Sequence, residues 1–311
     1  MNRPSIAFAG TGTFAVPCLE ALKKTTDIKL IISQPPKPSG KKRVLIKSPV
    51  CWMSEKLGLQ IAIPRNIEDI NDKISSLNLE LLIVADYGQI IPNSTLKIPK
   101  YGCLNIHPSL LPRHRGPAPV VATILNGDCE AGITIIKMDE KMDHGPIVAQ
   151  ERCPLSGRET TSDLEAKLAQ KASQLIVKYL PQFLAGNITL REQQHELATY
   201  HKLLKRSDGE LRWTETAELI ERKFRAYYPW PGIWLKKNIH GQEKIIKLLA
   251  VELLSGPVPV LAPGTFFWKD DILGITTIKE ALKVNFLQIE GKKALTGEPF
   301  LRGYEDIIIR I

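Results

Sequence analysis

Apolar runs alternate with helical patterns through the first half of the chain, and this alternation limits the possible folds more than any other feature. Five strand-like apolar runs occupy residues 6–9, 28–33, 81–85, 103–107 and 133–137. Segments with helical spacing lie between them, at residues 14–24, 49–57 and 118–125. The run at 81–85 is apolar throughout, as in a parallel strand that is buried on both faces. The alternation predicts a doubly wound α/β domain, whose ligands bind at the carboxyl ends of the strands.

The second half of the chain has a different pattern. Residues 160–185 have helical spacing, and the polar stretch 186–198 has no periodicity, so we expect a linker there. A helical pattern at 216–225 is followed by short β-like runs that proline and glycine interrupt. Many short strands between turn residues suggest a small β-barrel. We therefore expect a first domain at residues 1–186, a linker at 187–203 and a second domain at 204–311.

Composition narrows the class of protein. Hydrophobic residues make up 43% of the chain, as in an ordinary globular protein. The sequence has no uninterrupted apolar run of about 18 residues and no signal peptide at its start, so we expect no membrane association. The five cysteines are scattered, without CxxC or metal-ligand spacing. This distribution favours a reduced, cytoplasmic protein without a metal site.

The chain is basic, with a net charge of +9 from 42 basic and 33 acidic residues. The excess is spread along the whole chain. A polyanionic partner that contacts both halves would fit this charge. A well-solvated basic surface would fit it equally, so the charge alone does not identify a partner.

An amide and an imidazole stand two residues apart at the end of the run 103–107. Side chains at i and i+2 of a strand point to the same face, so Asn105 and His107 can aim at one substrate atom. A donor amide and an imidazole that holds a proton suit a developing oxyanion. The stiff stretch Ser109-Leu110-Leu111-Pro112 could then form one wall of a pocket for a flat ligand. The alternative is a buried strand end whose asparagine caps the next turn.

This stretch is part of a longer pattern. Asn105-x-His107-x-Ser109-Leu110-Leu111-Pro112-x-x-Arg115-Gly116, followed by Asp139-x-x-Met142-Asp143-x-Gly145, closely resembles the formyltransferases that use 10-formyltetrahydrofolate. The resemblance covers nearly the whole chain. It implies a Rossmann-like formyltransferase domain followed by a smaller, OB-like β-barrel. It also implies that Asn105, His107 and Asp143 are the catalytic residues, that 10-formyltetrahydrofolate is the formyl donor, and that no metal takes part.

Two segments are candidates for the folate pocket. Val84-Ala85-Asp86-Tyr87-Gly88-Gln89-Ile90-Ile91-Pro92 resembles the family segment that lines the pterin site, which implies pocket roles for Gln89, Ile90 and Ile91. The same resemblance places Ser109, Leu110, Leu111 and Pro112 beside the folate. Asp86 departs from the family pattern, which usually has a small residue there, and we interpret it as an exposed loop charge.

The segment Gly10-Thr11-Gly12-Thr13-Phe14-Ala15 matches the dinucleotide-binding fingerprint G-x-G-x-x-A. A dinucleotide site also needs an acidic residue after the second strand, and this chain has Ser33-Gln34-Pro35 there. We therefore favour a tight strand-to-helix turn that belongs to the fold. Together with Val16-Pro17, the segment also resembles the N-terminus of the family members that formylate methionyl initiator tRNA.

The loop 34–50 carries five basic residues and no acidic one. It could bind the phosphates or the unpaired end of a nucleic acid, or it could be a solvated surface loop. It resembles the loop with which the tRNA-specific family members enter the acceptor stem, which implies tRNA contacts for Lys41, Lys42 and Arg43. Lys41 stands where that loop usually has arginine. Lysine keeps the charge but loses the planar, bidentate geometry.

The resemblance as a whole implies formyl transfer from 10-formyltetrahydrofolate to the α-amino group of methionyl initiator tRNA. We expect a cytoplasmic monomer whose barrel and basic loop hold the tRNA. The nearest alternative is a formyltransferase that acts on an amino sugar nucleotide with the same catalytic residues. A third hypothesis is a non-catalytic RNA-binding protein with this fold, and the presence of Asn105, His107 and Asp143 argues against it.

Overall fold

The computed structural model of the chain describes residues 3–39 and 44–311. The predicted tRNA contacts Lys41, Lys42 and Arg43 lie outside the described residues. The chain folds into two compact units. The N-terminal unit consists of Met1–Thr123, Cys129–Leu155 and Asp163–Leu203, and the C-terminal unit consists of Ile124–Asp128, Ser156–Ser162 and Leu204–Ile311.

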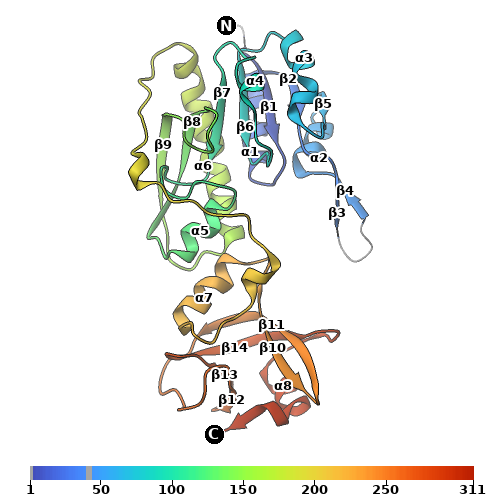
Figure 1. Ribbon diagram of the computed structural model, residues 1–311, viewed down its shortest axis with the longest axis vertical. Helices are drawn as coiled ribbons and strands as arrows, with labels where there is room; N and C mark the ends of the chain where they lie inside the picture. Colours follow the sequence, from blue (N-terminus) through green and yellow to red (C-terminus); the bar gives the residue numbers. More distant parts are fainter. Residues whose placement is uncertain (1–2, 40–43) are drawn as a thin grey trace. The chain divides into compact units, whose positions relative to one another are not determined.

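A seven-stranded sheet forms the centre of the N-terminal unit (Figure 1). Its parallel neighbours are, in spatial order, β5 (Ile61–Ala62), β2 (Asp27–Ile32), β1 (Ser5–Gly10), β6 (Leu81–Ala85) and β7 (Cys103–His107). Beyond β7, the strands β8 (Glu130–Lys137) and β9 (Ile147–Pro154) continue the sheet in antiparallel pairs. The five predicted strands are confirmed, whereas the sequence pattern does not predict β9.

The burial of these strands explains why the sequence pattern predicts them. Every residue of β6 is buried, and so is every residue of β1 after Ser5. Such strands read as continuous apolar runs, as expected where helices cover both faces of a parallel sheet. Leu82 belongs to a core cluster that also contains Leu30 and Ile74. Truncating a side chain buried this deeply costs roughly 2–5 kcal/mol.

Helices follow or connect the strands of this part of the chain. They are α1 (Ala15–Thr25), α2 (Pro49–Lys56), α3 (Asn71–Ser76), α4 (Asn93–Leu96), α5 (Pro119–Leu125) and α6 (Thr161–Leu184), with 3-10 turns η1 (Ile67–Ile70) and η2 (His195–Leu197). The predicted helices of this part of the chain are confirmed. At the start of α2, the Ser48 hydroxyl accepts a hydrogen bond from the Cys51 N–H over 3.0 Å, and Pro49 occupies the first turn, where it has no helical hydrogen bond to lose. No helix among the described residues is long and apolar enough to span a membrane.

A short two-stranded ribbon stands apart from the main sheet (Figure 1). Its strands, β3 (Lys37–Ser39) and β4 (Val44–Ile46), both belong to the basic loop 34–50. The side chains of β4 are exposed, although all three residues are apolar. The ribbon leads from the end of β2 into α2.

The C-terminal unit is built on a second, curled sheet. Its strands follow the spatial order β10 (Ile233–Ile239), β11 (Gln242–Leu253), β14 (Ala281–Ile289), β13 (Ile272–Thr276), β12 (Phe266–Lys269) and β16 (Ile308–Arg310), and β15 (Ala294–Leu295) pairs with β14. The unit also contains η3 (Arg206–Gly209), α7 (Ala217–Ala226), α8 (Gly297–Gly303) and η4 (Glu305–Ile307). Phe266 and Phe300, both fully buried, meet edge-on with ring centroids 5.4 Å apart. The predicted helix at 216–225 and the run of short strands are confirmed.

Candidate active site

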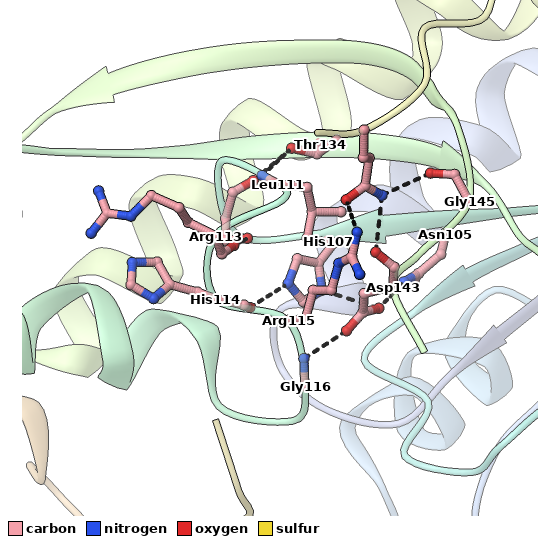
Figure 2. A network of polar contacts seen from close by, with 12 residues as sticks. Asn105, His107, Leu111, Arg113, His114, Arg115, Gly116, Thr134, Asp143 and Gly145 are labelled. Carbon is pink, nitrogen blue, oxygen red and sulfur yellow. Dashed lines mark hydrogen bonds and ion pairs between the residues drawn. The ribbon is translucent and has the colours of Figure 1, made fainter. Parts of the chain in front are cut away.

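Three polar side chains meet at the carboxyl end of β7 (Figure 2). Asn105 Nδ2 donates a hydrogen bond to Asp143 Oδ1 over 3.2 Å, although 38 positions separate the two residues. His107 Nδ1 lies 3.6 Å from the same carboxylate oxygen. Asn105 is half-buried and His107 is 5% exposed. The structure therefore brings together the three residues that the resemblance marks as catalytic.

The hydrogen bonds of His107 show where its proton lies. Nε2 is 3.0 Å from the backbone oxygen of His114. A carbonyl oxygen can only accept, so Nε2 must carry a proton. Nδ1 faces Asp143, so the protonated ring presents a donor to the carboxylate.

Asp143 lies in the 138–146 loop, which connects β8 to β9. Its second oxygen, Oδ2, accepts a hydrogen bond from the Gly116 N–H over 2.8 Å. The backbone of Asp143 has a φ of 51°, a left-handed conformation that residues with a Cβ seldom adopt. Gly145 approaches Lys137 so closely that a Cβ would lie 1.9 Å from the Lys137 carbonyl oxygen. The backbone of this loop is thus tightly constrained, which restricts the position of the carboxylate.

The 109–112 turn follows β7 and is anchored to the two antiparallel strands. Thr134 of β8 donates to the Ser109 carbonyl over 2.7 Å and accepts from the Leu111 N–H over 3.2 Å. Gln150 of β9 donates to the Leu111 carbonyl over 2.9 Å. Ser109 and Leu111 are buried, whereas Leu110 and Pro112 are half-buried. Among the predicted folate contacts of this turn, Leu110 and Pro112 therefore have the more accessible side chains.

The other predicted folate segment follows β6. Since β6 and β7 are parallel neighbours, it lies at the same edge of the sheet as His107. Ile90 is 78% exposed, whereas Ile91 is buried in the core. Gln89 donates from its side chain to the Arg65 carbonyl over 3.1 Å. Of these three residues, Ile90 offers the most side-chain surface to a ligand.

The residues that follow β6 contact the Gly10–Gly12 turn. The Thr11 N–H donates to the Asp86 carbonyl over 2.9 Å, and the Thr11 hydroxyl donates to the Tyr87 carbonyl over 2.8 Å. A Cβ at Gly12 would lie 1.7 Å from Asp86 Oδ2. These contacts support the interpretation that the glycines serve the packing of β1 against the end of β6.

Two carboxyl groups of the N-terminal unit, Asp86 and Glu165, have altered proton affinities. Asp86 reaches solvent, but the protein around it reduces its hydration and raises its pKa to about 6. Desolvation, followed by the charge of Asp86, raises the pKa of Glu165 to about 7. Near neutral pH, Glu165 is therefore partly protonated.

The polar 191–201 segment, which follows α6, contacts the residues after β7. Arg115 is 1% exposed. Its guanidinium donates to three side chains of this segment: the Tyr200 hydroxyl over 2.7 Å, Gln193 Oε1 over 2.7 Å and His195 Nδ1 over 2.8 Å. The lack of periodicity in this segment predicts a linker, so no local pattern identifies Gln193 as a residue of the site.

The histidines of the 138–146 loop and the 191–201 segment contact one another. His144 Nδ1 donates to Asp139 Oδ2 over 2.6 Å. The ring of His144 stacks on the ring of His195 with centroids 3.9 Å apart. Within residues 3–39 and 44–311, no group of three or more His, Cys, Asp or Glu side chains is arranged to hold a metal ion.

Known proteins match both parts of the chain. The family model described as formyl transferase matches residues 4–180, and that of the formyl transferase C-terminal domain matches residues 203–305. The methionyl-tRNA formyltransferase of Bartonella henselae is 36% identical over 302 residues, which cover 96% of this chain and 96% of that protein. The protein of the same name from Granulibacter bethesdensis is 38% identical over 309 residues, which cover 98% and 95%.

Solved structures share the fold at lower identity. The sugar 3N-formyl transferase WlaRD aligns with a TM-score of 0.64 and 19% identity over 94% of this chain and 100% of its own. HypX from Aquifex aeolicus, solved with tetrahydrofolic acid, aligns with a TM-score of 0.59 and 16% identity over 100% of this chain and 49% of its own. These structures establish a common architecture, with a Rossmann-like unit built on a mainly parallel sheet and a second unit after it.

Proposed function

The chain belongs to the formyltransferase family, and we propose that it transfers the formyl group of 10-formyltetrahydrofolate to the α-amino group of methionyl initiator tRNA. The observation that carries the proposal is the meeting of Asn105, His107 and Asp143 at the end of β7. Relatives named methionyl-tRNA formyltransferase match the chain across both units at 36–38% identity, whereas the sugar formyl transferase WlaRD is 19% identical. The product would serve initiation of translation in the cytoplasm.

In the proposed reaction the free α-amine attacks the formyl carbon, and the formyl oxygen becomes an oxyanion. Asn105 has two amide protons, and Asp143 accepts one of them. The other proton can be donated to the oxyanion, which is where preorganised donors lower the barrier most. His107, in its protonated form, would stabilise the oxyanion through its positive charge, because its two N–H groups face Asp143 and the His114 carbonyl.

Collapse of the tetrahedral intermediate breaks the bond between the formyl carbon and N10 of the folate. The attacking nitrogen loses a proton and N10 gains one. Asp143 would keep His107 in place and, through a water molecule, help to remove the amine proton. Binding both substrates in one complex makes the step effectively unimolecular, which supplies a further part of the acceleration.

We assign the folate pocket to the two segments at the carboxyl edge of the sheet. Gln89, Ile90 and Ile91 would line one side of it, and Ser109, Leu110, Leu111 and Pro112 the other. The position of both segments beside the end of β7 supports this assignment. The formyl donor acts as a substrate that leaves as tetrahydrofolate, and no metal is needed for the step.

We assign recognition of the tRNA to two parts of the chain. In the basic loop, Lys41, Lys42 and Arg43 would contact backbone phosphates. The C-terminal unit would be an OB-like barrel, a fold that commonly binds oligonucleotides. The domains would then be residues 1–186 for catalysis, 187–203 as the linker and 204–311 for tRNA binding, in a monomeric enzyme.

The described part of the basic loop also contributes an apolar surface, which supports a role in tRNA binding. A shallow groove of about 740 Å³ is lined by residues of the β1–α1 turn, β4 and α2, among them Thr13, Leu45 and Trp52. Trp52 is 60% exposed. An exposed indole is a suitable platform for an unpaired base, so this groove would receive part of the single-stranded acceptor end.

Parallel formylation assays test the proposal. 10-Formyltetrahydrofolate is offered with methionyl initiator tRNA, methionyl elongator tRNA or a 4-amino sugar nucleotide. We expect formylation of the initiator tRNA and little of the other two. Transfer to the sugar nucleotide alone would leave the catalytic residues in place and refute the substrate. Salt-dependent binding of tRNA without any transfer would refute the enzymatic function.

A further inference from the structure

Gln193 joins the 191–201 segment to the loop that carries Asp143. Its Nε2 donates to the backbone oxygen of Asp143 over 2.9 Å and to that of Gly145 over 2.7 Å. Its Oε1 accepts a hydrogen bond from Arg115 over 2.7 Å. The residue is 5% exposed. Both ends of this buried amide therefore have partners within the N-terminal unit.

The chemistry of these partners fixes the orientation of the amide. Carbonyl oxygens only accept hydrogen bonds and a guanidinium only donates them. The opposite orientation would place the Gln193 oxygen against two carbonyl oxygens and its N–H groups against Arg115. A buried polar group without a partner is costly, so a single orientation is stable.

This contact bears directly on the position of the Asp143 carboxylate. The left-handed backbone of Asp143, with a φ of 51°, persists only where its surroundings hold it. Gln193 holds the backbone oxygen of Asp143, while the Gly116 N–H holds Oδ2. Rotation of this backbone would move the carboxylate away from His107. A misplacement of about 1 Å in an active site can cost about 100-fold in rate.

Arg115 stabilises the same arrangement from the other side. Its acceptors Gln193, His195 and Tyr200 all lie in the 191–201 segment. Its planar fork can serve several acceptors at fixed angles, which a lysine ammonium at the end of a flexible chain cannot reproduce.

We propose that Gln193 is a positioning residue of the active site, which fixes the backbone of Asp143 and thereby directs its carboxylate toward His107, and that Arg115 keeps the Gln193 amide in the required orientation. The inference rests on the proposed function, since it takes Asp143 to act in formyl transfer. It assigns a role in catalysis to a segment whose sequence predicts only a linker.

The variant Gln193→Glu tests the proposal. Glutamate has the same size and still accepts from Arg115, but it replaces the donor N–H groups with an oxygen that repels two carbonyl oxygens. We expect kcat to fall about 10- to 100-fold, while the KM values for both substrates change by less than about twofold. The pH profile of kcat should differ from that of the wild type, because the position of Asp143 relative to His107 changes.

The matched control is Gln194→Glu, which adds the same charge at the next residue, an exposed position. It should have the kcat and the pH profile of the wild type. Thermal unfolding of each variant shows whether it is folded at the assay temperature. A folded Gln193→Glu variant with the kcat and pH profile of the wild type would overturn the proposal. So would a Gln194→Glu variant with an equal loss of kcat.

A second variant keeps the test decisive if Gln193→Glu does not fold. Arg115→Lys retains the charge and loses the fork, so kcat should fall about 3- to 10-fold at nearly constant KM. An unchanged kcat would then refute the proposal. The wild-type protein in the same assay reports on formylation of methionyl-tRNA, so the role of Gln193 can fail while the proposed function stands.

Discussion

The guanidinium of Arg115 donates to the side-chain oxygen of Gln193 across 2.7 Å, although 78 positions separate the two residues. Arg115 follows β7, and Gln193 lies in a stretch without regular secondary structure. Through this bond, the end of the central sheet and a polar segment far along the chain share one buried network. The shape of the candidate site therefore depends on residues well beyond the stretch that contains Asn105 and His107.

The variant Asp143→Asn tests the role of the negative charge, because asparagine is neutral and has nearly the same size as aspartate. The amide that replaces it is neutral and can no longer present two acceptor oxygens to Asn105 and Gly116. We expect kcat to fall about 100-fold or more, with little change in the KM for either substrate. Steady-state kinetics with methionyl initiator tRNA measure this effect.

The control for this variant is Asp139→Asn, in the same loop. It removes the same charge, but its carboxylate binds His144 rather than His107. We expect this variant to retain nearly normal kcat. Equal losses in the two variants would show that the charge of the loop matters and that the contact with His107 does not.

His107→Ala should abolish transfer and leave binding of tRNA nearly intact. The imidazole contacts Asp143 and the backbone of His114, and neither contact involves the basic loop or the C-terminal unit. Loss of a general acid or base usually costs about 100- to 10,000-fold in rate. Single-turnover formylation together with filter binding of methionyl-tRNA measures both effects. Near-normal turnover in this variant would remove His107 from the mechanism.

The parts of the fold that could be predicted from the sequence have strong local patterns. The bounds predicted for two strands, residues 81–85 and 103–107, are those of β6 and β7. The charged residues Glu80 and Asp86 flank the first strand, and the turn formers Gly102 and Pro108 flank the second. β9 lies at the edge of the sheet, and Gln150-Glu151-Arg152 interrupt its apolar residues. It therefore has neither a continuous apolar run nor a clear alternation, and only its pairing with β8 reveals it.

Only some residues of the candidate site could be predicted from a local sequence pattern. Asn105 and His107 share a face for the local reason that strand side chains alternate. Asp143 reaches them through the shape of a loop, and only the family resemblance marks it in the sequence. Gln193 contacts the backbone of Asp143 across 50 positions. Such a contact depends on tertiary structure, and no periodicity of the 191–201 segment indicates it.

Stability should depend on pH through Glu165. Its pKa rises from 4.5 to about 7 in the folded protein, mainly by desolvation and then by the charge of Asp86. Between these values the folded state binds more protons than the unfolded state, so this group makes the protein less stable as the pH rises from about 4.5 to about 7. Glu165→Gln cannot titrate, and we expect its melting temperature to fall less over this range than that of the wild type.

The comparison is made by thermal unfolding at several pH values between about 4.5 and 8. Glu20→Gln, which removes an exposed carboxylate from α1, is the matched control and should follow the wild type. Curves of the same slope for Glu165→Gln and the wild type would show that Glu165 does not carry this dependence.

The final prediction concerns the basic loop. Changing Lys41, Lys42 and Arg43 together to Ala should raise the KM for methionyl initiator tRNA by about tenfold or more, because the variant loses the three phosphate contacts that we propose for this loop. The dependence of log affinity on log salt should become shallower by about 2 to 3. The KM for 10-formyltetrahydrofolate should not change, since the two segments to which we assign folate binding follow β6 and β7. A control with Lys24, Lys97 and Lys100 changed to Ala removes the same charge from exposed positions ahead of β2 and β7. If both triple variants lose tRNA affinity equally, the effect is one of net charge and the loop has no special role; if the loop variant loses folate binding as well, the loop supports the catalytic unit rather than the tRNA.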